Sequence, residues 1–167
     1  MKPIPSDPPP RPGDASQLAL ERFLPFRLSV LSNRMTRAVA GVYARHFHLS
    51  APEWRTMAVL GRYGATTANS VVEHTAMDKV RVSRAVARLL VAGHVTRRTD
   101  ATDRRRAILD LTTEGRAVYD RIVPLVLAVE AELLADLSDE ERLVLEAAVR
   151  KLEARTAKTS AVDDDND

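Results

Sequence analysis

Cysteine is absent from the 167-residue sequence, which excludes disulfides, zinc–thiolate sites and thiol-based redox sensing. Aromatic residues make up only 4% of the chain, and it contains 6 glycines. Alanine, leucine, arginine, glutamate and valine dominate instead, a composition typical of helices and unfavourable for extended sheets. We therefore expect a mainly α-helical protein.

Long apolar runs are also missing. No run approaches the roughly 20 residues needed to cross a bilayer, and the N-terminus lacks the apolar core of a signal peptide. The simplest interpretation is a cytoplasmic protein that has no membrane partner. Because 45% of its residues are hydrophobic, the chain can form one domain with a real core, alone or completed by a second copy.

The charges are unevenly distributed, although the formal net charge is only +2. Residues 79–106 include nine basic and two acidic side chains, whereas acidic residues prevail over 130–146 and again over the last five positions. A basic middle with acidic flanks indicates a local surface that binds a polyanion.

The N-terminal segment differs in composition from the rest of the chain. Six of the nine prolines fall within residues 1–16, which predicts a disordered or polyproline arm over residues 1–22. From Pro25 onward apolar residues recur at steps of three and four, which predicts a helix of about twenty residues.

A second helix is signalled by its capping residues. Ser50 and Glu53 form a capping box, with Pro52 in the first turn, and Gly64 provides a stop. The first two helices make up a predicted dimerisation and ligand-binding unit over residues 23–65.

Two short helices are expected next. Thr67 can cap a third helix that extends to about Met77, and Asp78 can cap a fourth that ends at Gly93. The fourth helix presents one apolar side, made of Val82, Val86, Leu89 and Leu90.

A hairpin follows these helices, because residues 94–98 and 107–111 are β-compatible and a polar stretch separates them. Two short helices joined by a tight turn and followed by a hairpin form a winged helix-turn-helix, whose second helix enters the major groove of DNA. We assign this lobe to residues 66–112.

Two long helices are predicted in the C-terminal part. Thr112 can cap a fifth helix, in which Pro124 is expected to introduce a kink. Ser138 and Glu141 form a second capping box, so a sixth helix begins there and extends to about Arg155.

These C-terminal helices, over residues 113–156, precede an acidic tail over residues 157–167. Together with the first helix, they carry more apolar side chains than one small lobe can cover: Leu28, Leu31, Met35, Leu125, Val129, Leu133, Leu143 and Leu152. We therefore expect a homodimer, and its two-fold symmetry requires a pseudo-palindromic DNA site.

The basic side chains of the fourth helix fall mostly opposite its apolar side. Arginine binds guanine O6 and N7 bidentately, and hairpin arginines can reach phosphates or a narrow minor groove. An ordinary solvated helix face is the alternative. The candidate DNA-binding residues are Lys79, Arg81, Ser83, Arg84, Arg88, Arg97, Arg98, Arg104, Arg105 and Arg106.

Four motifs occur in a characteristic order: Asp78-Lys79-Val80-Arg81-Val82-Ser83-Arg84, Leu89 to Gly93, Asp103-Arg104-Arg105, and Leu111-Thr112-Thr113-Glu114-Gly115. From about Leu24 to Leu152 the chain resembles the MarR family of regulators. The resemblance implies a homodimer with paired terminal helices and with ligand sites between the dimer helices and the DNA-binding lobes. Val72 and Arg81 depart from the family pattern, in which small residues are usual.

Three further stretches, residues 24–34, 52–55 and 75–79, resemble the branch that responds to hydroxycinnamoyl-CoA thioesters or related aromatic acids. Arginines could meet a carboxylate or CoA phosphates, and aromatic side chains could enclose the ring. A buried tryptophan with solvated arginines is the equally simple alternative. The candidate ligand-binding residues are Arg27, Arg34, Tyr43, Trp54, Arg55 and Met57.

The sequence contains no motif that indicates catalysis or metal sensing. No serine lies in a nucleophile-elbow pattern, no glycine-rich phosphate loop occurs, and the four histidines form no compact cluster with carboxylates. We predict no enzyme activity, no cofactor and no metal site.

The leading hypothesis is a ligand-responsive repressor of aromatic-compound catabolic genes that binds double-stranded DNA. It would be released by a small aromatic acid or a hydroxycinnamoyl-CoA-type effector. The alternatives are a constitutive DNA-binding regulator and a helical adaptor for an acidic protein partner.

Overall fold

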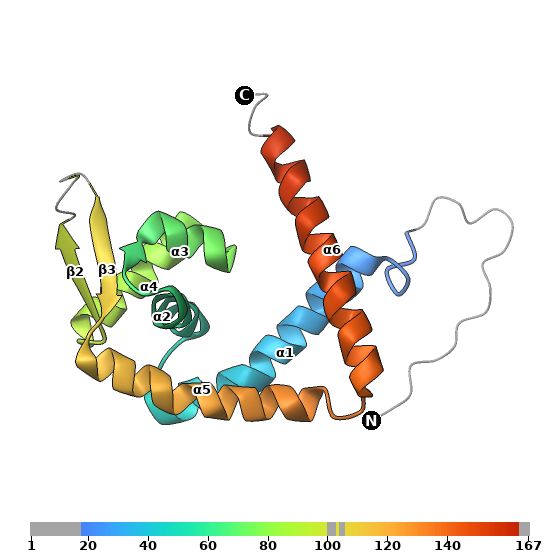
Figure 1. Cartoon of the computed structure of the whole chain (residues 1–167), viewed down its shortest axis with the longest axis horizontal. Helices are drawn as coiled ribbons and strands as arrows, with labels where there is room; N and C mark the ends of the chain where they lie inside the picture. The colour runs from blue at the N-terminus through green and yellow to red at the C-terminus, as the bar shows by residue number, and fades with distance from the viewer. Residues whose placement is uncertain (1–17, 100–102, 104–105, 164–167) are drawn as a thin grey trace, which may run out of the picture. The chain divides into compact units, whose positions relative to one another are not determined.

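The computed structural model describes residues 18–99, 103 and 106–163. The predicted fold class is confirmed, since the described chain is mainly helical with a small antiparallel sheet (Figure 1). Its elements are α1 (Leu24–Phe47), α2 (Ala51–Tyr63), β1 (Thr66–Thr67), α3 (Ala68–Thr75), α4 (Lys79–Val91), β2 (Val95–Thr99), β3 (Ala107–Leu111), α5 (Thr113–Leu133) and α6 (Asp139–Asp163). The chain divides into two compact units at Arg37 and Ala38, within the sequence of α1.

The start and end of α2 follow the predicted capping signals. The backbone N–H of Ser50 donates to the Glu53 carboxylate at 2.6 Å, and the Ser50 hydroxyl bonds to the same carboxylate. At the other end, Gly64 has φ +78°, and its N–H donates to the Leu60 carbonyl at 2.9 Å. This positive φ suits glycine, which explains why the helix ends there.

The helix-turn-helix pair is likewise held by side-chain caps. The Thr67 hydroxyl accepts from the Ser70 N–H at 3.2 Å, and the Asp78 carboxylate accepts from the Arg81 N–H at 2.7 Å. α3 ends at Thr75, before the predicted Met77, because Ala76 adopts a left-handed conformation with φ 51°. That residue forms the turn into α4.

The sheet has the strand order β1-β3-β2, and both pairings are antiparallel. The predicted hairpin is present, with its first strand shifted by one residue to Val95–Thr99. β1 was not predicted, because two threonines are too short to show strand periodicity and they also serve as a helix cap. In register, Arg97 lies opposite Leu109, and Arg98 lies opposite Ile108.

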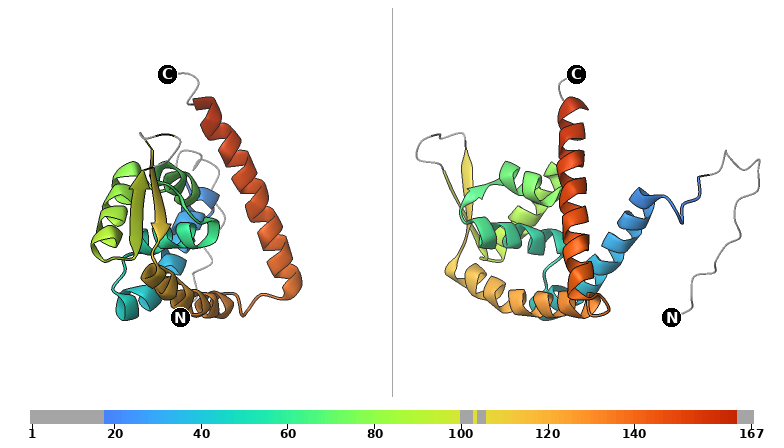
Figure 2. Two further views of the ribbon diagram at one scale, coloured as in Figure 1. Left: turned by 60° about the vertical axis from the view of Figure 1, so that its left-hand side comes forward. Right: turned by 45° about the vertical axis from the view of Figure 1, so that its right-hand side comes forward.

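The core of the second unit lies between the short helices, the sheet and α5. α4 contacts α2, α3 and β2, and the views in Figure 2 show α3 and α4 beside the strands. The largest fully buried side chains belong to all these elements: Met57, Leu60, Val71, Val82, Leu89, Leu109 and Ile122. The sheet is thus fixed against α4, which sets the position of the hairpin relative to that helix.

The two C-terminal helices begin at the predicted caps. The Thr112 hydroxyl accepts from the Gly115 N–H at 2.9 Å, and the Ser138 N–H donates to the Glu141 carboxylate at 2.8 Å. α6 extends past the predicted end near Arg155 to Asp163, since no proline or glycine interrupts this stretch.

Some predicted features lie outside the described residues. These are residues 1–17 of the proline-rich arm, Arg104 and Arg105 of the hairpin, and residues 164–167 of the acidic tail. Among the helices of the described ranges, none has the length and apolar character that spanning a membrane requires.

Candidate nucleic-acid interface

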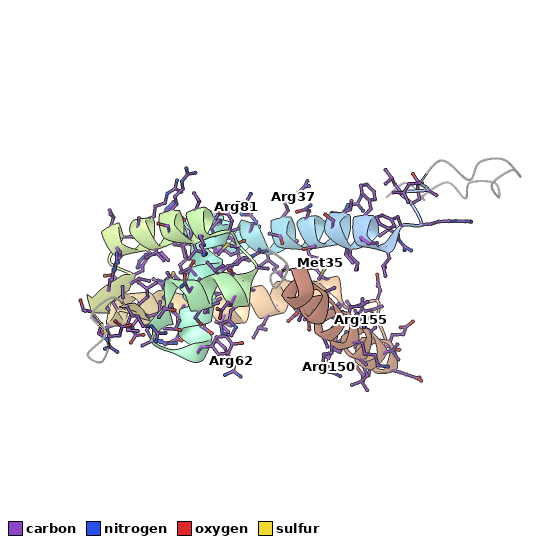
Figure 3. All side chains as sticks on the ribbon, turned by 90° about the horizontal axis from the view of Figure 1, so that it is seen from above. Met35, Arg37, Arg62, Arg81, Arg150 and Arg155 are labelled. Atoms are coloured by element: carbon purple, nitrogen blue, oxygen red, sulfur yellow. The ribbon has the colours of Figure 1, made fainter. Side chains whose placement is uncertain are left out.

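α4 separates its apolar and its basic side chains onto opposite sides. Its buried side carries Val82, Ala85, Val86 and Leu89, which pack into the core. The five candidate DNA-binding residues of this helix are all exposed: Lys79, Arg81, Ser83, Arg84 and Arg88. Side chains project from the outer side of α4, where Arg81 is labelled (Figure 3). The helix can therefore stay packed in the lobe while it offers cations to a partner.

Arg81 is held by the residue that caps α4. Its Nε lies 3.2 Å from the Asp78 carboxylate, and both side chains are largely exposed. Such a surface pair adds little stability, but it restrains the guanidinium at the start of the helix. The terminal nitrogens of Arg81 still carry donors that a DNA phosphate or base could accept.

Three arginines of α4 border a small hollow. Arg81, Arg84 and Arg88 line it together with Ser50 and Pro52 at the start of α2, and its volume is about 120 Å³. Arg81 lies in the first turn of α4 and Arg88 in its last turn, so the three cations are spread along the helix. Three cations around one hollow produce a local positive potential.

A larger groove of about 310 Å³ lies between α4, α3 and the sheet. It brings Lys79 and Ser83 of α4 together with Arg97 of β2, over a floor that includes Val86 and Leu109. Arg98 does not join them, since neighbouring residues of a strand point to opposite faces of the sheet. The structure therefore unites some of the predicted DNA-binding residues and separates Arg98 from them.

Arg106 belongs to a third hollow, of about 670 Å³, which is lined by β3, β1 and the start of α3. Thr67, Asn69 and Ser70 contribute polar side chains there, and Glu73 adds an acidic one. These polar residues are not among the predicted DNA-binding residues, although hydroxyl and amide groups at a helix N-terminus are suited to phosphate contact. Because Thr67 was recognised as the cap of α3, its position could have pointed to them.

The predicted ligand-binding aromatics form part of the core. The rings of Tyr43 and Trp54 stack with centroids 5.9 Å apart, and Tyr119 of α5 stacks on Trp54 at 5.8 Å. Met57 is completely buried, whereas Arg55 is exposed. Burial raises the pKa of the Tyr43 hydroxyl above its usual value, and the charge of Arg55 acts in the opposite direction.

The two remaining candidates for ligand binding, Arg27 and Arg34, are exposed side chains of α1 in the first unit. Tyr119 was absent from the predicted set. Tyr119 is partly buried and packs against the core. Its position directly after Val118, on the predicted apolar side of α5, was the sequence signal for this packing.

The base of the hairpin is bonded to the start of α5. The Thr112 hydroxyl donates to the Gly93 carbonyl at 2.7 Å, and the Thr112 N–H donates to the His94 carbonyl at 3.0 Å. Gly115 lies so close that a Cβ built there would be 1.9 Å from the His94 carbonyl oxygen. The end of α4, the hairpin and α5 therefore meet at one tight junction.

Within the part of the chain that the structure describes, no three histidine or carboxylate side chains gather as a metal site would require. The candidate interface consists mainly of cations, hydroxyls and an amide, with Glu73 as an acidic member. Cations, hydroxyls and amides are the groups that proteins use to contact phosphates and base edges.

Comparison with known proteins agrees with this arrangement. A family model described as the MarR family matches residues 49–106. The HTH-type transcriptional regulator PecS of Dickeya dadantii is 32% identical over 129 residues, which cover 75% of this chain and 77% of PecS.

Solved structures share the fold. A MarR-family regulator from Silicibacter pomeroyi has a TM-score of 0.71 and 25% identity over 82% of this chain and 92% of its own. A mutant MarR from Escherichia coli, complexed with operator DNA, has a TM-score of 0.73 over 82% of this chain and 99% of its own. Its identity is 22%, so this likeness concerns the fold alone.

Proposed function

Because this chain belongs to the MarR family of transcriptional regulators, we propose that it binds a pseudo-palindromic operator as a homodimer, with α4 in the major groove. It is a DNA-binding regulator and not an enzyme. The observation that carries the proposal is the division of α4 into a buried apolar side and an exposed basic side.

The surroundings of α4 support this placement. Lys79 and Arg97 border the groove between α4 and the sheet, and Arg106 lies beside the start of α3. In this arrangement Arg84 would contact a base edge while Arg97 and Arg106 would contact the flanking backbone. A helical adaptor for an acidic protein is the rival interpretation, and it predicts no preference for one DNA sequence.

Arg106→Ala should weaken binding to every DNA sequence by a similar factor. Loss of one phosphate contact should also flatten the plot of log affinity against log salt concentration by about one unit. The measurement is fluorescence anisotropy of a labelled operator and of a scrambled duplex at several salt concentrations. Lys151→Ala, on an exposed part of α6, serves as the control with the same charge change. An unchanged salt slope would remove Arg106 from the interface.

The proposal of a homodimer is supported by exposed apolar side chains on the terminal helices. Each helix carries several of them, which is unusual for the surface of a protein that stays monomeric. They are Leu24, Phe26, Leu28 and Leu31 on α1, Leu125, Leu127 and Leu133 on α5, and Leu143, Val144, Leu145, Val149 and Leu152 on α6.

Light scattering at micromolar concentration should give twice the mass of one chain. Leu152→Asp should shift this equilibrium toward the monomer, because burying a carboxylate in an apolar interface is costly. Glu153→Gln, at the neighbouring exposed position, should leave the mass unchanged. A monomeric wild-type protein would contradict the homodimer and, with it, the two-fold operator.

The finer part of the proposal concerns regulation. We infer that a small aromatic acid or an acyl-CoA thioester releases the protein from the operators of aromatic-compound catabolic genes. Arg27 and Arg34 support this, because seven residues of helix place two exposed guanidinium groups on nearly one face, about 10 Å apart. That spacing suits separated anionic groups of one extended ligand.

The aromatic candidates constrain this inference. Since Tyr43 and Trp54 stack on each other and Met57 is buried, a ligand ring that used them would have to displace part of this packing. Shifting the bound population from 99:1 to 1:99 requires the ligand to favour the released form by about 5.5 kcal/mol. Several charge-assisted bonds and a buried ring are of that order.

Titration of the protein–operator complex with hydroxycinnamoyl-CoA thioesters, free aromatic acids and CoA alone tests the effector. Arg34→Ala should raise the concentration needed for release about tenfold, as expected for one lost charge-assisted bond. Arg37→Ala, also exposed on α1, should leave it unchanged. If none of the compounds releases wild-type protein at millimolar concentration, the effector assignment is wrong, while the proposed DNA binding stands.

A further inference from the structure

Val80 differs from its neighbours in the first turn of α4. Its side chain is 58% exposed, whereas Val82 and Val86 of the same helix are buried. Valine is a poorer helix former than lysine or arginine, and an exposed side chain gains little from burial. The folded lobe therefore gives no stability reason for valine at this position.

Val80 lies in the middle of the exposed face of α4. At 100° per residue, Val80, Arg84 and Ala87 lie along one line of α4, directly opposite the buried side. Lys79 and Arg81 lie toward the edges of the exposed face. The middle of that face thus combines one arginine with small apolar side chains, which are Val80 in the first turn, Ala87, and Val91 in the last turn.

The only apolar group that base edges present in the major groove is the C5 methyl of thymine, and a helix face of this kind can contact it. A β-branched side chain matches it well, because valine has one strongly preferred χ1 rotamer in a helix and holds its methyl groups in place. Lysine, arginine and serine contact the polar groups of base edges or phosphates instead.

We propose that Val80 determines operator specificity by packing against the C5 methyl of a thymine in each half-site, close to the base that Arg84 contacts. This inference rests on the proposed function, because it requires α4 to lie in the major groove. It adds a contact that makes no hydrogen bond and that depends on a single methyl group of the DNA.

The test uses the operator that wild-type protein selects from random DNA. Each thymine is replaced in turn by deoxyuridine, which removes only the methyl group. Wild-type protein should bind about fourfold more weakly at one position per half-site, as expected for one buried methyl. Val80→Ala should bind the unmodified operator more weakly and should not distinguish thymine from deoxyuridine at that position.

Val91→Ala is the matched control, since Val91 is 92% exposed in the last turn of the same helix. This variant should keep the full response to deoxyuridine. The inference is overturned if no position responds in wild-type protein, or if Val80→Ala retains the response. Failure of wild-type protein to bind any operator specifically would instead overturn the proposed function, and the Val80 contact with it.

Discussion

Gly115→Ala is expected to lower the free energy of unfolding by at least about 3 kcal/mol. The added Cβ would lie 1.9 Å from the His94 carbonyl oxygen and 2.8 Å from its carbonyl carbon. Both are backbone atoms, so the clash cannot be relieved by rotating a side chain. Either α5 or the base of the hairpin must move, and the bonds that Thr112 makes to Gly93 and His94 would be strained.

Urea denaturation followed by circular dichroism measures this effect. Gly41→Ala is the matched control, because the atoms nearest to the same added methyl in α1 belong to the flexible side chain of Arg45. That variant should be neutral or more stable by up to about 1 kcal/mol, since glycine is unfavourable within a helix. A Gly115→Ala protein as stable as wild type would show that the junction between the hairpin and α5 is looser than described.

Arg84→Ala should weaken binding to the specific operator by about 1 to 3 kcal/mol per half-site. Arg84 lies one turn into α4, on the exposed side and away from Val82 and Val86. There its guanidinium can donate two bonds to guanine O6 and N7, and alanine can make neither. The preference at one base pair per half-site should relax, because no other group would replace that pattern.

Affinity measurements with operators substituted at each base pair distinguish base contact from phosphate contact. Substitution of a residue that contacts a base removes discrimination at one base pair. Substitution of a residue that contacts phosphate weakens the affinity for all sequences equally. Arg150→Ala provides the control, since its exposed pair with Glu146 on α6 should contribute little to stability. If Arg84→Ala weakens every operator equally, Arg84 contacts phosphate.

The helix starts could be predicted because their signals are local. A cap requires one side-chain oxygen and a backbone N–H two or three residues further on, so both partners are visible in a short stretch of sequence. Thr67, Asp78 and Thr112 were predicted as caps, and each accepts the expected bond. The order of these elements was enough to predict the winged helix-turn-helix.

Features that depend on pairing between distant segments could not be predicted in the same way. β1 exists because Thr66 and Thr67 pair with β3, some forty residues further on. Arg97 and Arg98 were treated alike, but strand register places them on opposite faces of the sheet. Their different surroundings follow from that alternation.

The aromatic candidates show the same dependence on distant contacts. Sequence alone left open whether Trp54 lines a ligand site or fills the core. Its stacking partners, Tyr43 and Tyr119, come from helices far apart in the chain. Their packing explains the burial of Trp54, while the proposed ligand role awaits the titration.

Selection of binding sites from random duplex DNA by the wild-type protein tests the central claim most directly. If a homodimer places one copy of α4 in each of two major grooves, the selected sequences should share a pseudo-palindrome. Its half-site centres should lie about one helical turn, roughly 10 to 10.5 base pairs, apart. Enrichment of no sequence, or of a motif without dyad symmetry, would contradict the account.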